Sequence, residues 1–229
     1  MTKAKVLPMK LRRLVGLVLA LSLIACKVGA TTITSFGNIT PNQFVSTDNG
    51  NGTTTLSVTA DVNITQIFMG PLDPDALLTF TATSVGDATT FGPLVTQNFV
   101  GSFTLTNQAG TFNYLSGSFG GALQIGTVGG TNSLFTSNNA LLAPLTLSSD
   151  LSALTSPESF SLSLANLSPA FSVDTSGGHT TIGSFTASFT GDADATIPSA
   201  VPEPASLVLL GTGLVGMAGG LRRKLFRRA

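Results

Sequence analysis

Histidine-dependent chemistry has one residue to draw on in this sequence, because His179 is the only histidine. A Ser-His-Asp triad would need it as the general base. It follows Gly177 and Gly178, which is typical of an exposed turn, and no nucleophile-elbow pattern of the form G-x-S-x-G accompanies it. Zinc is also disfavoured, because residues 31–200 contain one histidine and no cysteine. We therefore predict that His179 is a turn residue without a catalytic role.

Two short acidic pieces are the other candidates for chemistry, Asp73-Pro74-Asp75 and Asp192-Ala193-Asp194. Calcium takes six to eight oxygen ligands, so loop acids in contact with water are the better interpretation of such short pieces. A glycosidase needs only two well-placed acids, which keeps a carboxylate-based hydrolase open as an alternative. The chain offers no Trp and one Tyr, Tyr114, on which a sugar could stack. We predict no catalytic residues, no metal site and no cofactor.

Positive and negative side chains occupy different parts of the chain. No Lys or Arg lies between Val28 and Leu221, so every basic residue is near one of the two ends. The acids of residues 31–200 are Asp48, Asp61, Asp73, Asp75, Asp87, Asp150, Glu158, Asp174, Asp192 and Asp194. A surface of this charge repels phosphate backbones, so nucleic acid is not an expected partner. The separation indicates that the ends and the middle have different tasks.

The middle of the chain alternates between apolar and small polar residues. Every second residue is apolar from Leu56 to Ile64, and shorter alternating runs begin at Phe103, Phe160 and Phe185. A period of two predicts strands with one buried and one hydrated face, and this pattern favours antiparallel sheets. We predict that residues 31–200 form one all-β domain, an antiparallel β-sandwich or jelly roll. The residues expected in its core include Phe103, Phe160, Leu162, Leu164 and Phe185.

Turn-forming residues separate the alternating runs. Asp48 to Gly52 contains two Asn-Gly pairs, and Asn107 to Gly110 and Ser176 to Gly178 also lie between candidate strands. We expect a β-hairpin at each of these three places. Asn139 to Leu154 is the one stretch of this segment that suits a short helix.

The N-terminus has the three parts of a secretory signal peptide. A basic region precedes an apolar run from Leu14 to Ala25, and Val28-Gly29-Ala30 ends in a small residue. We predict a signal helix within residues 1–30 and cleavage after Ala30. A competing interpretation is lipidation at Cys26, because Leu23-Ile24-Ala25-Cys26 matches the short lipobox of bacterial lipoproteins. The basic region before the apolar run consists of Lys3, Lys5, Lys10, Arg12 and Arg13.

The C-terminus, residues 201–229, also has three parts in a fixed order. Pro202-Glu203-Pro204 comes first, and an uncharged apolar run from Ala205 to Leu221 follows. As a helix this run would be about 25 Å long, at the short end for a membrane span. A basic cluster after it would stay in the cytoplasm and stop transfer, with the preceding domain facing outward. The cluster consists of Arg222, Arg223, Lys224, Arg227 and Arg228.

This order of motif, apolar helix and terminal basic cluster resembles the PEP-CTERM sorting signal. The resemblance covers about residues 201 to 228. It implies that Pro202, Glu203 and Pro204 form the recognition motif for exosortase, a membrane protease-transpeptidase that processes the tail. It further implies a Gram-negative bacterium and a link to exopolysaccharide and biofilm.

Two export signals and the lack of a catalytic constellation together predict a non-enzymatic protein of the cell surface or extracellular matrix. It would be held in the inner membrane by the C-terminal helix before processing, and then reside at the cell surface or outside the cell. A polysaccharide-binding module is the alternative, with exopolysaccharide as the partner.

Overall fold

The computed structural model describes residues 30–68, 70, 72–138 and 144–197, and all regular structure in these residues is β-strand. The prediction of an all-β domain is confirmed. The strands are β1 (Thr31–Asn38), β2 (Phe44–Asp48), β3 (Thr54–Ile67), β4 (Ala76–Ser84), β5 (Thr89–Phe91), β6 (Leu94–Thr106), β7 (Asn113–Thr127), β8 (Asn132–Asn138), β9 (Leu145–Ser148), β10 (Thr155–Ser168), β11 (Val173–Ser176), β12 (His179–Ile182) and β13 (Phe185–Thr196).

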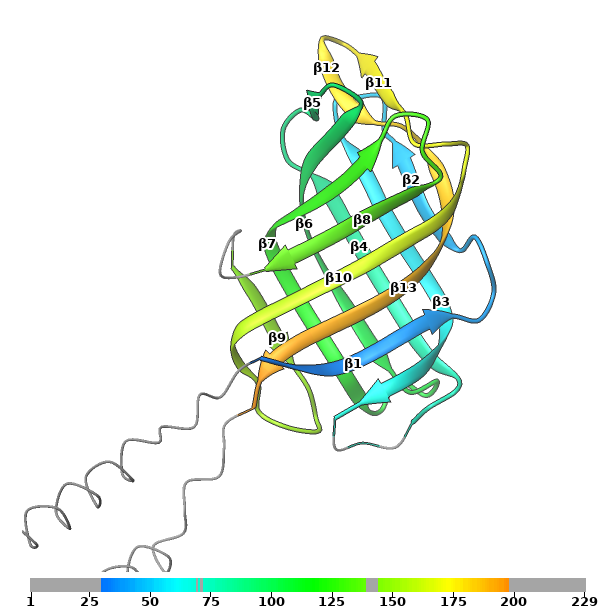
Figure 1. The fold of residues 1–229 in the computed structure, drawn as a ribbon. Coiled ribbons are helices and arrows are strands. Elements are labelled where there is room, and N and C mark those ends of the chain that lie inside the picture. The colour runs from blue at the N-terminus through cyan, green and yellow to red at the C-terminus, as the bar shows by residue number, and fades with distance from the viewer. Residues whose placement is uncertain (1–29, 69, 71, 139–143, 198–229) are drawn as a thin grey trace, which may run out of the picture.

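Eight antiparallel strands close into a barrel (Figure 1). Following hydrogen-bonded neighbours, the order is β6-β4-β3-β1-β13-β10-β8-β7, and β7 then pairs with β6 to complete the circle. Strand β2 bridges β3 and β13 at one end, β5 extends β6, and β11 and β12 form a separate hairpin. The expected two-sheet sandwich or jelly roll is therefore wrong. Both architectures bury alternate residues, so a period of two does not distinguish them.

Bulges bend the long strands around the barrel. The pairing register shifts within β1 between Thr32 and Thr34, and within β6 between Phe99 and Gly101. A bulge adds local twist and bends the strand that carries it, which a closed sheet requires. At Gly101 the strands also approach so closely that an added Cβ would lie 2.2 Å from the carbonyl oxygen of Thr81. Glycine is thus required where β6 bends against β4.

The three expected hairpins are present. The Asn-Gly segment joins β2 to β3, residues 107–112 join β6 to β7, and Gly177 and Gly178 join β11 to β12. Gly50 and Gly52 adopt φ angles of 68° and 85°, which explains why glycine alternates with asparagine there. The short helix considered for Asn139 to Leu154 is wrong for residues 144–154, which contain β9, and residues 139–143 lie outside the described part.

Phenylalanine rings fill the interior of the barrel. Phe80 lies next to four other rings, and the rings of Phe103 and Phe160 stack with centroids 3.9 Å apart and planes 14° apart. Gly117 leaves room for this pair, because a Cβ there would lie 2.5 Å from the Phe103 ring. All five residues predicted for the core are buried, with exposed fractions of 2% or less.

Beside β9 a side chain takes the place of the backbone ladder in the wall of the barrel. Strand β7 pairs with β8 along its second half and with β9 along its first half, and β9 pairs with no other strand of the described chain. The far side of β9 contacts β10. There the backbone N–H of Leu147 donates a hydrogen bond to the carboxylate of Glu158, which is 7% exposed. Burial raises the pKa of Glu158, and this hydrogen bond lowers it by a smaller amount.

Replacing a ring of the stacked pair should destabilise the barrel strongly. We expect Phe103→Ala to reduce the free energy of unfolding by about 3–5 kcal/mol, because it removes apolar contacts and leaves a cavity. Phe91→Ala is the matched control, since the Phe91 side chain is 84% exposed and should change stability by about 0.5 kcal/mol or less. Urea unfolding of the purified protein measures both, and equal losses would contradict the assigned interior.

The buried Glu158 predicts a specific pH dependence of stability. Its pKa is higher in the folded than in the unfolded protein, so its contribution to stability is present at low pH and is lost as the pH rises through the folded-state pKa. Glu158→Gln keeps a hydrogen-bond acceptor for Leu147 and removes the ionisation. We expect this variant to be as stable as the wild type at about pH 4 and more stable than the wild type at about pH 7.

Urea unfolding over this pH range gives the measurement, and Asp174→Asn, at an exposed position of β11, is the control. If both variants differ from the wild type in the same pH-dependent way, the burial of Glu158 does not cause the pH dependence of stability.

Candidate functional site

Both ends of the described chain, beyond which the predicted export signals lie, are at the same end of the barrel. Thr31 at the start of β1 pairs with Ala195 near the end of β13, so the first and last described residues lie side by side (Figure 1). Residues 1–29 and 198–229 lie outside the described part of the chain. The positions predicted there are Cys26, Pro202, Glu203, Pro204, Arg222, Arg223, Lys224, Arg227 and Arg228.

The apolar run from Ala205 to Leu221 also lies outside the described residues. In the part of the chain that the structure describes, no helix is long and apolar enough to cross a membrane. The predicted transmembrane helix and signal helix therefore stay predictions.

His179 lies at the opposite end of the barrel, as the first residue of β12. Its Nδ1 is 2.9 Å from Oδ1 of Asp87, and the two side chains are 57% and 51% exposed. The ring also packs against the β2–β3 turn, because a Cβ on Gly52 would lie 2.7 Å from its Cγ. Within the described residues Asp87 is the one hydrogen-bond partner of this ring. The arrangement fastens one surface turn to two others.

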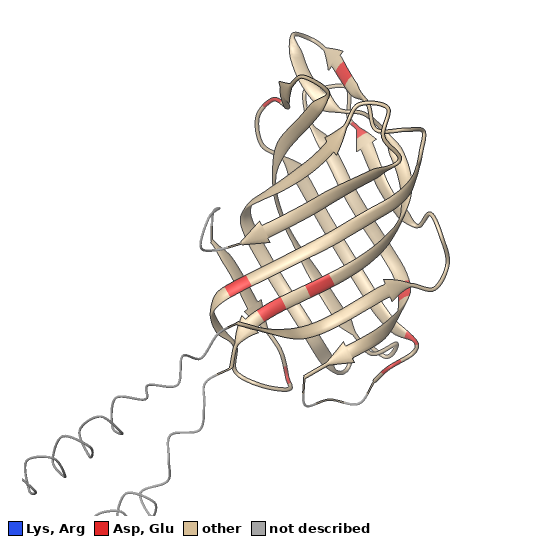
Figure 2. Cartoon of the chain, viewed as in Figure 1, with Lys and Arg blue, Asp and Glu red and all other residues tan. Residues whose placement is uncertain are grey.

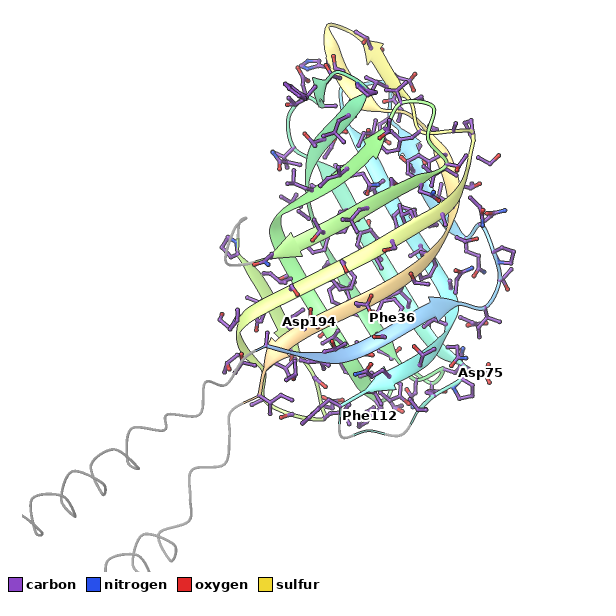
Figure 3. The ribbon with its side chains drawn as sticks, viewed as in Figure 1. Phe36, Asp75, Phe112 and Asp194 are labelled. Carbon is purple, nitrogen blue, oxygen red and sulfur yellow. The ribbon has the colours of Figure 1, made fainter. Side chains whose placement is uncertain are left out.

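Asp73 also joins separate segments of the barrel by hydrogen bonds. The hydroxyl of Tyr114 donates a 2.8 Å hydrogen bond to Asp73 Oδ2, and the backbone N–H of Asp75 donates to Oδ1 at 3.0 Å. Burial raises the pKa of Tyr114, and the hydrogen bond to Asp73 and the charge of Asp73 raise it further. Tyr114 also packs on Phe112 with ring centroids 5.1 Å apart. These contacts tie the β3–β4 loop to β7 at the lower end of the barrel, where Figure 3 labels Asp75 and Phe112.

The acids of β13 accept hydrogen bonds from the two neighbouring strands. Ser35 of β1 donates to Asp192 Oδ1 at 2.6 Å, and Ser159 of β10 donates to Asp194 Oδ2 at 3.0 Å. Figure 3 shows Asp194 on β13, beside β10. No group of three or more His, Cys, Asp or Glu side chains suited to a metal ion occurs among the described residues. Each acidic piece instead holds neighbouring segments together.

A regular array of hydroxyl groups covers the opposite side of the barrel, on strands β3, β4, β6, β7 and β9. Two rows of residues run across these strands, each residue paired in register with the next. The first row is Ser57, Thr81, Ser102, Ser118 and Thr146, and the second is Thr59, Thr79, Thr104, Ser116 and Ser148. We call these ten residues the hydroxyl wall.

A shallow cavity of about 300 Å³ lies at one end of the hydroxyl wall. Its polar lining comes from β6, β7 and β9, with Phe103, Gly117 and Leu147 between the polar residues. The polar lining residues are Ser102, Thr104, Ser116, Ser118, Thr146 and Ser148. All six belong to the hydroxyl wall, so the cavity and the array form one surface.

Sequence reasoning missed this surface. The Ser and Thr residues at alternate positions were visible, but which strands lie side by side and in which register was not. The signal that could have found it is the spacing itself, since each strand contributes two hydroxyl residues separated by one residue, which is a buried apolar residue on four strands and Gly117 on β7.

Most charges of the barrel lie away from the hydroxyl wall, but Asp61 of β3 borders it as the next exposed residue after Thr59. Figure 2 shows acids at both ends of the barrel and on β10 and β13, with no Lys or Arg on the described residues. None of the ten wall positions carries a charge. The wall is thus a neutral hydrogen-bonding surface on an acidic protein.

Comparison with known proteins identifies the tail. Residues 200–224 match the family model of the PEP-CTERM protein-sorting motif. No curated protein and no solved structure matches the chain. The match covers the tail that resembles this signal, and it begins four residues after the end of β13. The chain thus carries a PEP-CTERM sorting motif, which marks it as an exported protein that is anchored in the membrane before exosortase processes it.

Proposed function

We propose that the barrel is a non-enzymatic structural component of the cell surface or extracellular matrix of a Gram-negative bacterium, linked to exopolysaccharide and biofilm. The observation that carries the proposal is the sorting motif at residues 200–224, directly after the last strand of the barrel. The barrel is therefore the part that the sorting system delivers.

The contacts of the reactive side chains support a structural role. His179, Asp73, Asp192 and Asp194 each make a hydrogen bond that joins two separate segments of the barrel. A catalytic acid or base must be able to reach a substrate. In this barrel Asp73, Asp192 and Asp194 accept hydrogen bonds that stabilise the fold, which favours architecture over catalysis for these acids. His179 is 57% exposed, and its contact with Asp87 joins surface turns.

The position of the chain ends supports delivery from a membrane anchor. Because Thr31 pairs with Ala195, both signals join the barrel at one end. The five residues from Pro198 to Pro202 span at most about 17 Å when fully extended. In this proposal exosortase acts close to the end of the folded barrel that carries Thr31 and Thr196.

Processing at both ends should give a protein without Lys or Arg. We expect the mature chain to begin near Thr31 and to end close to Pro204. It would retain the acids of the barrel and no Lys or Arg, so its isoelectric point should lie far below the full-chain value of about 6.5. Intact-mass measurement of surface, medium and membrane fractions tests this. Acylation at Cys26 with retention of Lys27 would show a lipoprotein instead.

The motif itself can be tested by substitution. Replacing Pro202, Glu203 and Pro204 together with Ala should leave a membrane-bound chain that retains Arg222 to Arg228. Substituting Pro198 and Ser199 with Ala is the control, because it also removes a proline from the segment before the apolar run but lies outside the motif. If the wild-type chain also keeps its full-length tail in cells that possess exosortase, the tail is a plain membrane anchor.

A further inference from the structure

The hydroxyl wall has hydrogen-bonding capacity that the fold does not use. Six of its hydroxyl groups, on β3, β4 and β6, make no hydrogen bond to any described residue; they belong to Ser57, Thr59, Thr79, Thr81, Ser102 and Thr104. Two hydroxyls near the cavity, Ser118 and Thr146, lie 2.9 Å apart and bond each other. On β7, Ser116 also accepts a hydrogen bond from Asn113 and donates one to the Ser148 carbonyl, so the unused capacity lies mainly on β3, β4 and β6.

The other side of the barrel shows the contrast. There Ser35 and Ser159 donate to Asp192 and Asp194, so two of the hydroxyl groups are already bonded and two negative charges lie among the others. A ligand bound there would have to compete with charge-assisted hydrogen bonds, which are stronger than neutral ones. The ten wall positions carry no charge, so a ligand there meets no such competition. Asp61 beside Thr59 and the net negative charge of the barrel disfavour an anionic ligand, so the wall suits an uncharged one.

The wall is also held rigidly from behind. Phe80 of β4, Phe103 of β6 and Phe119 of β7 point into the core from three of its strands, and all are buried. Phe80 stacks on Phe119 with ring centroids 5.9 Å apart. Since these strands are fixed by their rings and by their backbone ladders, the backbone positions that carry the hydroxyl groups do not have to be ordered when a ligand binds. Preorganisation of this kind lowers the entropic cost of binding.

The hydroxyl groups of the array recur at a regular spacing, as the units of a linear polymer do. Neighbouring strands lie about 4.8 Å apart, and alternate residues of one strand about 6.8 Å apart, so each row offers a hydroxyl group at every strand. A linear chain of hydroxyl-bearing rings laid across the strands meets a new partner at each step. The cavity at β6, β7 and β9 is large enough to seat one sugar ring.

We propose that the hydroxyl wall is a binding site for a neutral, linear polysaccharide that lies across β4, β6, β7 and β9 with a ring in the cavity. The proposal rests on the proposed function, which places the barrel among exopolysaccharide, and it adds the site and the charge class of the ligand. Each sugar gains hydrogen bonds without aromatic stacking, so its contribution is small. Affinity therefore comes from repetition along the chain and increases with polymer length.

The test measures binding of the processed protein, recovered from the exporting cells, to immobilised polysaccharides. The probes are a neutral α-1,6-glucan, a neutral β-1,4-glucan, a neutral galactomannan and anionic alginate. We expect saturable binding to at least one neutral polymer, stronger for longer chains and unchanged in about 1 M salt, where charge interactions are screened within about 3 Å. Alginate should bind less well, because the protein has a net negative charge.

A pair of matched triple variants locates the site. Thr81→Val, Thr104→Val and Ser118→Ala remove hydroxyl groups from the wall, and we expect a loss of about tenfold or more in affinity, since several hydrogen bonds are lost together. Thr136→Val, Thr190→Val and Ser163→Ala make the same types of change on β8, β13 and β10 and should leave binding intact. Valine suits strands as well as threonine does, and unfolding midpoints verify that both variants fold.

Three results would overturn the proposal: binding to none of the neutral polymers, preference for alginate, or an equal loss in both triple variants. The mass measurements described above report on sorting and not on binding. A correctly sorted protein that fails to bind would therefore disprove the site alone, whereas binding by a protein with an unprocessed tail would leave the site standing and contradict the sorting.

Discussion

The pairing of β6 with β7 is the contact that turns this sheet into a barrel. Without it, the sheet would be an open ribbon from β5 to β9 with free edges, and free edges invite pairing with other chains. The ladder between β6 and β7 runs from Leu94 opposite Thr127 to Thr106 opposite Asn113. Closure places every ring of β4, β6 and β7 inside one core and every alternate hydroxyl residue outside. The interior and the hydroxyl wall are therefore consequences of the same pairing.

The absence of Lys and Arg from the barrel determines how its acids are used. An acid in most domains has a nearby cation, but here the partners are a tyrosine hydroxyl for Asp73, serine hydroxyls for Asp192 and Asp194, and a backbone N–H for Glu158. Such bonds hold segments together locally, while most of the stabilising free energy comes from apolar burial, which is the dominant favourable contribution to folding. The stacked rings of Phe103 and Phe160 in the core are one example of this apolar burial.

Sequence periodicity predicted the strands, the hairpins and the core residues, because each follows from contacts within a few residues. Leu162 alternates with Ser161 and Ser163 in the sequence whether the strands form a sandwich or a barrel. Barrel closure and the hydroxyl wall depend on which strands pair, and residues as distant as Ser57 and Thr146 share one row. Local patterns contain no such information. The tail was different, since the order of its three parts is itself the signal and is read along the chain.

The topology also links folding to export. Strand β1 is the first strand after the predicted signal peptide, yet it lies between β3 and β13 and pairs with both. Its contacts with β13 join residues such as Thr31 and Ala195, which are at opposite ends of the domain's sequence, and pairing over such a long sequence separation is slow because closing the loop costs entropy. The barrel cannot close until residues 185–196 are available to pair with β1 and β10. The sorting motif at residues 200–224 follows at once, so the strand that completes the fold is also the strand that connects it to the membrane anchor.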